Sequence, residues 1–117
     1  NHVKCGIEID ISSYEKPMRF RLVRPGSNWY TAGRTVECIL EDMRSITFKI
    51  ITPENKYYDE VVDISEIPFR EGKTTRVSVS VSFADSDKCN ITIKDLGFGE
   101  FVKSSGKVIS KELVLRS

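Results

Sequence analysis

Arg76-Val-Ser-Val-Ser-Val-Ser-Phe83 is the stretch of this 117-residue chain that decides its fold. Valine or phenylalanine occupies every second position after Arg76, and serine fills the positions between them. Because successive side chains of a strand point to opposite faces, this alternation predicts a β-strand with one face buried and the other in water.

The same alternation recurs along the chain and predicts six further strands, at Lys4–Ile11, Met18–Leu22, Thr35–Glu41, Ile46–Thr52, Val61–Ile64 and Cys89–Lys94. Turn-forming segments rich in Pro, Gly, Asn, Asp and Ser separate the strands, as at Arg24–Asn28 and Ala84–Lys88. Short strands joined by short turns predict an all-β fold, an antiparallel β-sandwich of about seven to eight strands.

Lys107–Leu115 fits two structures. Ile109, Leu113 and Leu115 share one face of a strand, whereas Val108 and Ile109 together with Leu113 also fit the spacing of a helix. The last element is therefore either another strand or a short C-terminal helix on the sheet.

The composition describes one globular domain spanning residues 1–117. Hydrophobic residues make up 39% and charged residues 30%, and 18 Lys and Arg nearly balance 17 Asp and Glu. That hydrophobic share excludes a disordered chain, and no apolar run is long enough to cross a bilayer. The nearly balanced charge argues against a nucleic-acid partner and against a membrane partner. No repeat or linker suggests a domain boundary.

The charge is unevenly distributed. Residues 37–66 contain eight acidic and three basic side chains, an acidic belt typical of a solvated sheet edge. A basic and aromatic cluster precedes it, made of Lys16, Arg19, Arg21, Arg24, Trp29, Tyr30 and Arg34. Such a cluster can stack single-stranded nucleic acid, but long cations that keep a strand soluble are the preferred interpretation.

The three cysteines are expected to be buried and reduced. Cys5, Cys38 and Cys89 each lie at an apolar position of an alternating run, without the CxxC spacing of a zinc or redox site. Small buried thiols in a protein without a visible export signal indicate a reducing, cytoplasmic location.

Catalytic motifs are missing from the sequence. His2 is the single histidine, so no Ser-His-Asp or Cys-His arrangement is available. Asp85 and Asp87 are read as turn formers, since the glycine and distal glutamate of a calcium loop do not follow. Neither Ser105–Val108 nor Leu96–Glu100 completes a phosphate-binding or dinucleotide-binding loop. We expect a protein that is not an enzyme and holds no cofactor or metal in this domain.

The order of the strand and turn motifs resembles the β-sandwich substrate-binding domain of DnaK-type heat-shock chaperones. The likeness rests on Gly6-Ile-Glu8, on the Ile-Pro stretch within Val62–Gly72, on the valine and serine strand, and on Cys89–Asp95 followed by Gly97. The resemblance implies a fragment of a larger multidomain DnaK-like protein. ATP would act only through an ATPase domain upstream.

The resemblance also implies a function. An unfolded or extended polypeptide would bind in a groove lined by Ile7, Ile9, Leu40, Ile46 and Phe48, through backbone hydrogen bonds and apolar pockets. Ordinary core packing of these same side chains is the alternative interpretation.

Two departures from the chaperone pattern favour a second function. Asp10 stands where the family has an apolar arch residue, and Glu37 stands at an apolar pocket position. A charge in a peptide pocket is costly unless it is paired or exposed. The alternative is a structural or protein-docking β-sandwich that has lost peptide binding and holds a partner protein domain. Its docking edge would contain Phe98 and Phe101, or the acidic belt.

Overall fold

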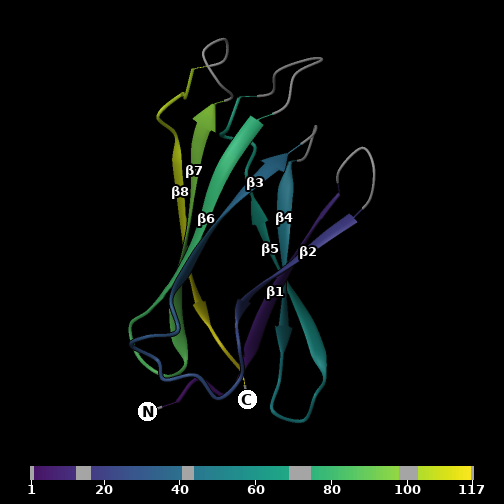
Figure 1. The fold of residues 1–117 in the computed structure, drawn as a ribbon, viewed down its shortest axis with the longest axis vertical. Helices are drawn as coiled ribbons and strands as arrows, with labels where there is room; N and C mark the ends of the chain where they lie inside the picture. Colours follow the sequence, from purple (N-terminus) through teal and green to yellow (C-terminus); the bar gives the residue numbers. More distant parts are fainter. Residues whose placement is uncertain (1, 13–16, 41–43, 69–74, 98–102, 117) are drawn as a thin grey trace.

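A computed structural model describes residues 2–12, 17–40, 44–68, 75–97 and 103–116. Within these residues the chain forms strands and no helix (Figure 1). The strands are β1 (Gly6–Ser12), β2 (Pro17–Val23), β3 (Arg34–Leu40), β4 (Ser45–Ile51), β5 (Tyr57–Asp63), β6 (Thr75–Phe83), β7 (Lys88–Gly97) and β8 (Val108–Val114). The predicted all-β class is confirmed. In the described part of the chain, no helix is long and apolar enough to cross a membrane.

The strands form two antiparallel sheets of four strands each. One sheet has the order β2-β1-β4-β5 and the other the order β3-β6-β7-β8. The chain passes from one sheet to the other between β2 and β3, returns between β3 and β4, and crosses again between β5 and β6, as the sequence of colours in Figure 1 shows. Both sheets contribute to a single buried cluster, which confirms the predicted β-sandwich.

The alternating pattern of the sequence determines which side chains enter the core. Every second residue of the central strands is almost completely buried, namely Ile7, Ile9, Ile11, Ile46, Phe48, Ile50, Val77, Val79, Val81, Cys89, Ile91 and Ile93. A slip of one residue in the strand pairing would expose the buried side chains of that strand to water. Burial of these side chains therefore strongly favours the observed register.

Two strands differ from the sequence expectation. β5 begins at Tyr57, four residues before the predicted Val61, because it is an edge strand whose inward Tyr58 and Glu60 are only half-buried. Such a strand lacks the clear apolar alternation of a central one. The ambiguous C-terminal segment is a strand: β8 pairs antiparallel with β7 from Lys88↔Val114 to Lys94↔Val108.

A cation from the opposite sheet protects each edge of the β2-β1-β4-β5 sheet. Arg34 Nη1 donates to the backbone oxygen of Arg21 on β2 at 2.6 Å, and Lys111 Nζ donates to the backbone oxygen of Val61 on β5 at 3.2 Å. Edge carbonyls with a partner are less available for pairing with another chain. The two contacts also tie the sheets together along both open sides of the sandwich.

A buried carboxylate closes the segment that leads from β7 to β8. Asp95 is almost completely buried, and its two oxygens accept hydrogen bonds from the backbone amides of Gly97 and Ser105, each at 2.9 Å. The hydroxyl of Ser104 donates to the Asp95 backbone oxygen. One side chain therefore joins the two ends of this connection.

Candidate functional site

The predicted groove residues lie inside the sandwich. Ile7, Ile9, Ile46 and Phe48 are 0% exposed, and Leu40 reaches the same buried cluster from the facing sheet. Ile9 and Phe48 stand directly opposite each other on the neighbouring strands β1 and β4. The structure thus brings the five residues together as a closed core, which an extended peptide can reach only if the sheets separate.

The two charges that depart from the chaperone pattern point outward and are paired. Asp10 accepts hydrogen bonds from Arg19 Nε at 2.7 Å and Arg19 Nη2 at 3.3 Å, and the hydrogen bond to this guanidinium lowers the pKa of the carboxyl. Glu37 Oε2 lies 3.8 Å from Arg76 Nη1 on β6, and the Glu37 side chain is 59% exposed. Neither carboxylate is an unpaired charge in an apolar site.

A row of alternating charges crosses the outer face of the β2-β1-β4-β5 sheet. Asp59 on β5 lies opposite Lys49 on β4, Lys49 lies opposite Glu8 on β1, and Glu8 lies opposite Arg21 on β2. We call these four residues the charge ladder. Opposite charges at directly facing positions of neighbouring strands stabilise a sheet.

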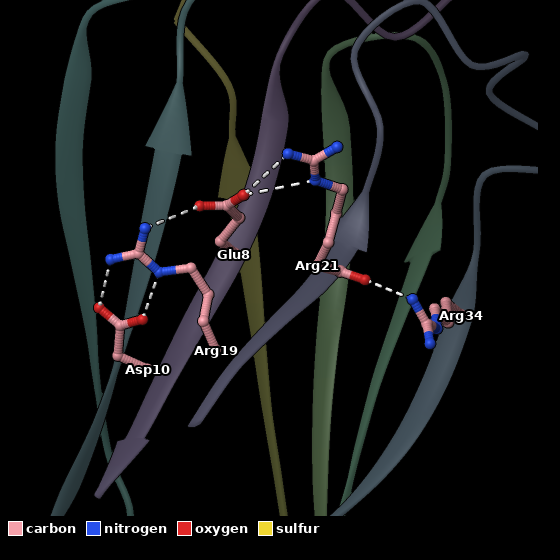
Figure 2. A network of polar contacts seen from close by, with 5 residues as sticks. All are labelled: Glu8, Asp10, Arg19, Arg21 and Arg34. Atoms are coloured by element: carbon pink, nitrogen blue, oxygen red, sulfur yellow. Dashed lines mark hydrogen bonds and ion pairs between the residues drawn. The ribbon is translucent and has the colours of Figure 1, made fainter. Parts of the chain in front are cut away.

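Glu8 is the most buried member of the charge ladder. Its side chain is 9% exposed although it points away from the core. Figure 2 shows why this is tolerated: Arg21 Nε and Nη2 both donate to Glu8 Oε2 at 3.3 Å, and Arg19 Nη1 lies 3.8 Å from Oε1. A carboxylate removed from water needs such partners.

Beside the charge ladder, a hollow opens where the chain passes from β2 to β3. We call it the arginine hollow; it is lined by Arg21, Arg24, Ser27, Thr31, Gly33 and Arg34, and its volume is about 400 Å³. Leu22 and Ala32 add a small apolar part to its wall. None of the described residues that line it is acidic.

The three arginines of the hollow differ in their partners. Glu8 holds the Arg21 guanidinium through Nε and Nη2, and the Arg21 backbone oxygen in turn holds Arg34 through Nη1 (Figure 2). The Arg24 side chain has no hydrogen bond or ion pair to any other residue that the structure describes. The hollow is therefore lined by two arginines whose side chains are held by partners and by Arg24, whose side chain has no partner among the described residues.

Local sequence fixes the backbone that carries Arg24. Pro25 and Gly26 occupy the centre of a turn closed by the Ser27 amide, which donates to the Arg24 backbone oxygen at 3.2 Å. Gly26 has a φ of 85°, which suits the third residue of a type II turn and favours glycine. The Gly26 amide also donates to the backbone oxygen of Val3 at 2.7 Å, so the turn is anchored to the N-terminal segment.

The other end of the hollow depends on Gly33. A Cβ atom at this position would lie 2.9 Å from the backbone oxygen of Val81 on β6, so no larger residue fits without a shift of the backbone. Between the two ends, Trp29 and Tyr30 form an edge-to-face pair with ring centroids 5.5 Å apart. Tyr30 is 68% exposed, the largest exposure among the large hydrophobic residues that the structure describes.

The sequence identified the basic and aromatic cluster, but it did not show that some of its arginines are paired with acidic residues and others are not. Arg19 and Arg21 belong to the outer sheet face and are bound to acidic partners, as expected for cations that cover a strand. Arg24 and Arg34 lie on the connection and at the start of β3, and no acidic residue of the described structure pairs with them. No sequence signal distinguishes the two pairs, because the neutralising acids come from another strand.

The cysteines are free and buried, which confirms the expectation for their side chains. Burial raises the pKa of the Cys38 thiol to about 11 and that of Cys89 to about 12, and it also raises the pKa of Cys5. Since thiolate is the reactive form, these thiols are unsuited to nucleophilic chemistry near neutral pH.

The remaining sequence predictions concern the Asp85 turn, metal binding and the docking edge. Asp85 Oδ1 accepts hydrogen bonds from the amides of Asp87 at 3.0 Å and Lys88 at 2.9 Å, which is the turn-forming role predicted for it. Among the described residues, no group of three or more His, Cys, Asp or Glu side chains could hold a metal ion. Phe98 and Phe101, the predicted docking edge, lie outside the described residues.

Comparison with known proteins gives a family for the chain. No curated protein and no solved structure matches it. One family model matches residues 2–115, which is nearly the whole chain. The protein therefore belongs to the family described as "Domain of unknown function (DUF8552)".

Proposed function

We propose that this domain is a non-enzymatic protein-docking module that binds an acidic segment of a partner polypeptide at the arginine hollow. One observation carries the proposal: three arginines line a hollow of about 400 Å³ whose described lining contains no acidic residue. Guanidinium groups bind carboxylates through paired, charge-assisted hydrogen bonds, so this lining favours an anionic ligand.

The surroundings of the hollow fit a protein ligand. Tyr30 is exposed on the same connection between β2 and β3, and arginine and tyrosine are among the residues that contribute most to protein interfaces. The partly exposed Ala32 provides apolar contact for the carbon chain of an acidic side chain. A concentrated positive surface also attracts acidic partners over a longer range.

Chaperone-like binding of an extended hydrophobic peptide is the competing function. It would require β1 and β4 to move away from the facing sheet, because Ile7, Ile9, Ile46 and Phe48 are fully buried. The charged hollow needs no such opening. Docking at the surface is therefore the function that the geometry supports better.

Fluorescence anisotropy with three labelled heptapeptides separates these functions: one rich in Asp and Glu, one hydrophobic and one rich in Lys. We expect saturable binding of the acidic peptide that weakens as salt is added, because exposed charges are screened. Arg24→Gln should weaken this binding because it removes one of the positive charges that line the hollow. It should leave the fold intact, since no described contact of the fold depends on the Arg24 side chain.

Arg76→Gln is the matched control. It removes the same charge from the outer face of the other sheet, where the exposed Glu37 at 3.8 Å is the one ion-pair partner of Arg76 among the described residues. The docking proposal fails if the acidic peptide does not bind at high micromolar concentration. Preferential binding of the hydrophobic peptide, unchanged by Arg24→Gln, would instead establish the chaperone-like function.

A further inference from the structure

Among the described residues, the arginines that line the arginine hollow have more donors without a partner than one carboxylate can accept from. Arg21 commits Nε and Nη2 to Glu8, so its Nη1 has no partner among the described residues, and Arg34 commits only Nη1 to the Arg21 backbone oxygen. The Arg24 side chain has no hydrogen-bond partner among the described residues. Each of the three arginines that line the hollow of about 400 Å³ therefore has at least one guanidinium nitrogen without a partner in the described structure.

From this we infer that the arginine hollow binds a phosphoryl group on a side chain of the partner polypeptide, an inference that rests on the proposed docking function. A phosphate monoester carries nearly two negative charges and three strong acceptor oxygens near neutral pH. It can therefore accept from three arginines, whereas a carboxylate has one charge and two oxygens. Arginine clusters are a recurring means of recognising phosphorylated segments.

The size and wall of the hollow indicate a carried phosphoryl group rather than free phosphate. A volume of about 400 Å³ lies within the range of pockets for small organic ligands and leaves room for the side chain that bears the phosphate. The partly exposed Ala32 offers that side chain a small apolar surface, and the exposed Tyr30 lies on the same connection.

The backbone around the hollow is already ordered for such a ligand. The Arg24–Ser27 turn is fixed by its own hydrogen bond and by the two bonds between Val3 and the residues Gly26 and Ser27, both at 2.7 Å. At the other end, Gly33 packs against the β6 backbone. Binding then orders mainly the Arg24 side chain, which limits the entropic cost.

The test is an NMR titration of the 117-residue chain with four probes: a heptapeptide containing one phosphoserine, the same peptide with glutamate in its place, inorganic phosphate, and a short single-stranded oligonucleotide. We expect the phosphopeptide to shift the backbone amides of residues 24 and 26–34 and to bind about tenfold more tightly than the glutamate peptide. Arg24→Gln should weaken phosphopeptide binding about tenfold, and the Arg76→Gln control should leave it unchanged.

The outcomes distinguish this inference from the proposed function. Equal binding of the phosphoserine and glutamate peptides overturns the phosphoryl preference and leaves acidic docking intact. Inorganic phosphate that binds as tightly as the phosphopeptide overturns the requirement for a carrier. Tighter binding of the oligonucleotide overturns a polypeptide ligand, and failure of both peptides to bind removes the inference together with the docking function.

Discussion

Glu8→Gln tests whether the charge ladder stabilises the fold. The substitution keeps the shape of the side chain and removes its charge, at a position where 9% of the side chain is exposed. Two hydrogen bonds from Arg21 at 3.3 Å lose their charged acceptor, and so does the more distant Arg19 at 3.8 Å. Both arginines are more than half exposed and can be hydrated instead.

The expected loss of stability lies between two limits. A hydrogen bond to a charged group contributes about 1.5–3 kcal/mol, and a fully exposed ion pair contributes less than about 1 kcal/mol. With a buried acid and an exposed base, we expect a loss of about 1 kcal/mol. For a domain of this length that corresponds to a decrease in Tm of about 4 °C.

A double-mutant cycle with Arg21→Gln measures the pair directly by urea unfolding. The coupling free energy should be about 1 kcal/mol and should decrease in 1 M salt, where screening is strong. Glu37→Gln is the control, because it removes the same charge from an exposed pair and should cost less than about 0.5 kcal/mol. A coupling energy near zero, or a Glu8→Gln protein as stable as the original, would refute the reasoning.

Four further predictions concern the fold and its thiols. Asp95→Asn should lower the free energy of unfolding in urea by about 1–3 kcal/mol, because an amide cannot accept both backbone hydrogen bonds that the carboxylate accepts. Gly33→Ala should cost about 1–3 kcal/mol, since its Cβ would meet β6 backbone at 2.9 Å, and the same protein should bind acidic peptide more weakly in the anisotropy assay. Cys89, with a pKa of about 12, should react with a thiol reagent at about pH 8 only after urea unfolds the chain, so rapid labelling of the folded protein would contradict its burial. Asp10 has a lowered pKa in the fold, so its contribution to the free energy of unfolding is present above its ordinary pKa and disappears as the pH falls through the lowered value. In an acid titration followed by circular dichroism, Asp10→Asn should therefore lose stability less steeply than the original protein.

The edge contacts make the two edge strands of one sheet less available for pairing with other chains. Both edge strands of the β2-β1-β4-β5 sheet have a carbonyl that accepts a hydrogen bond from a cation of the opposite sheet. At β2 this same contact places Arg34 beside Arg21 and forms one wall of the hollow. Edge protection and the candidate binding site thus share a residue.

Local sequence pattern predicted most of the strands and which of their faces are buried. Alternation at Arg76–Phe83 and at Cys89–Lys94 predicted β6 and β7, because a period of two residues is a local property of an extended chain. The same local reasoning placed the three cysteines among the apolar residues. It was weaker at β5, where an edge strand buries too little of Tyr57–Glu60 to require apolar residues.

The secondary structure of residues 108–114 and the availability of the arginines at the candidate site depend on tertiary contacts. Residues 108–114 form a strand because β7 offers them an unpaired edge, a condition that no local pattern contains. Ile7 and Phe48 line a closed core because two sheets meet there, and Arg21 is neutralised because pairing of β1 with β2 brings Glu8 opposite it. Arg24 and Arg34 receive no such acidic partner in the described structure. Their availability depends on contacts between segments distant in sequence, so it could be recognised only in the folded molecule.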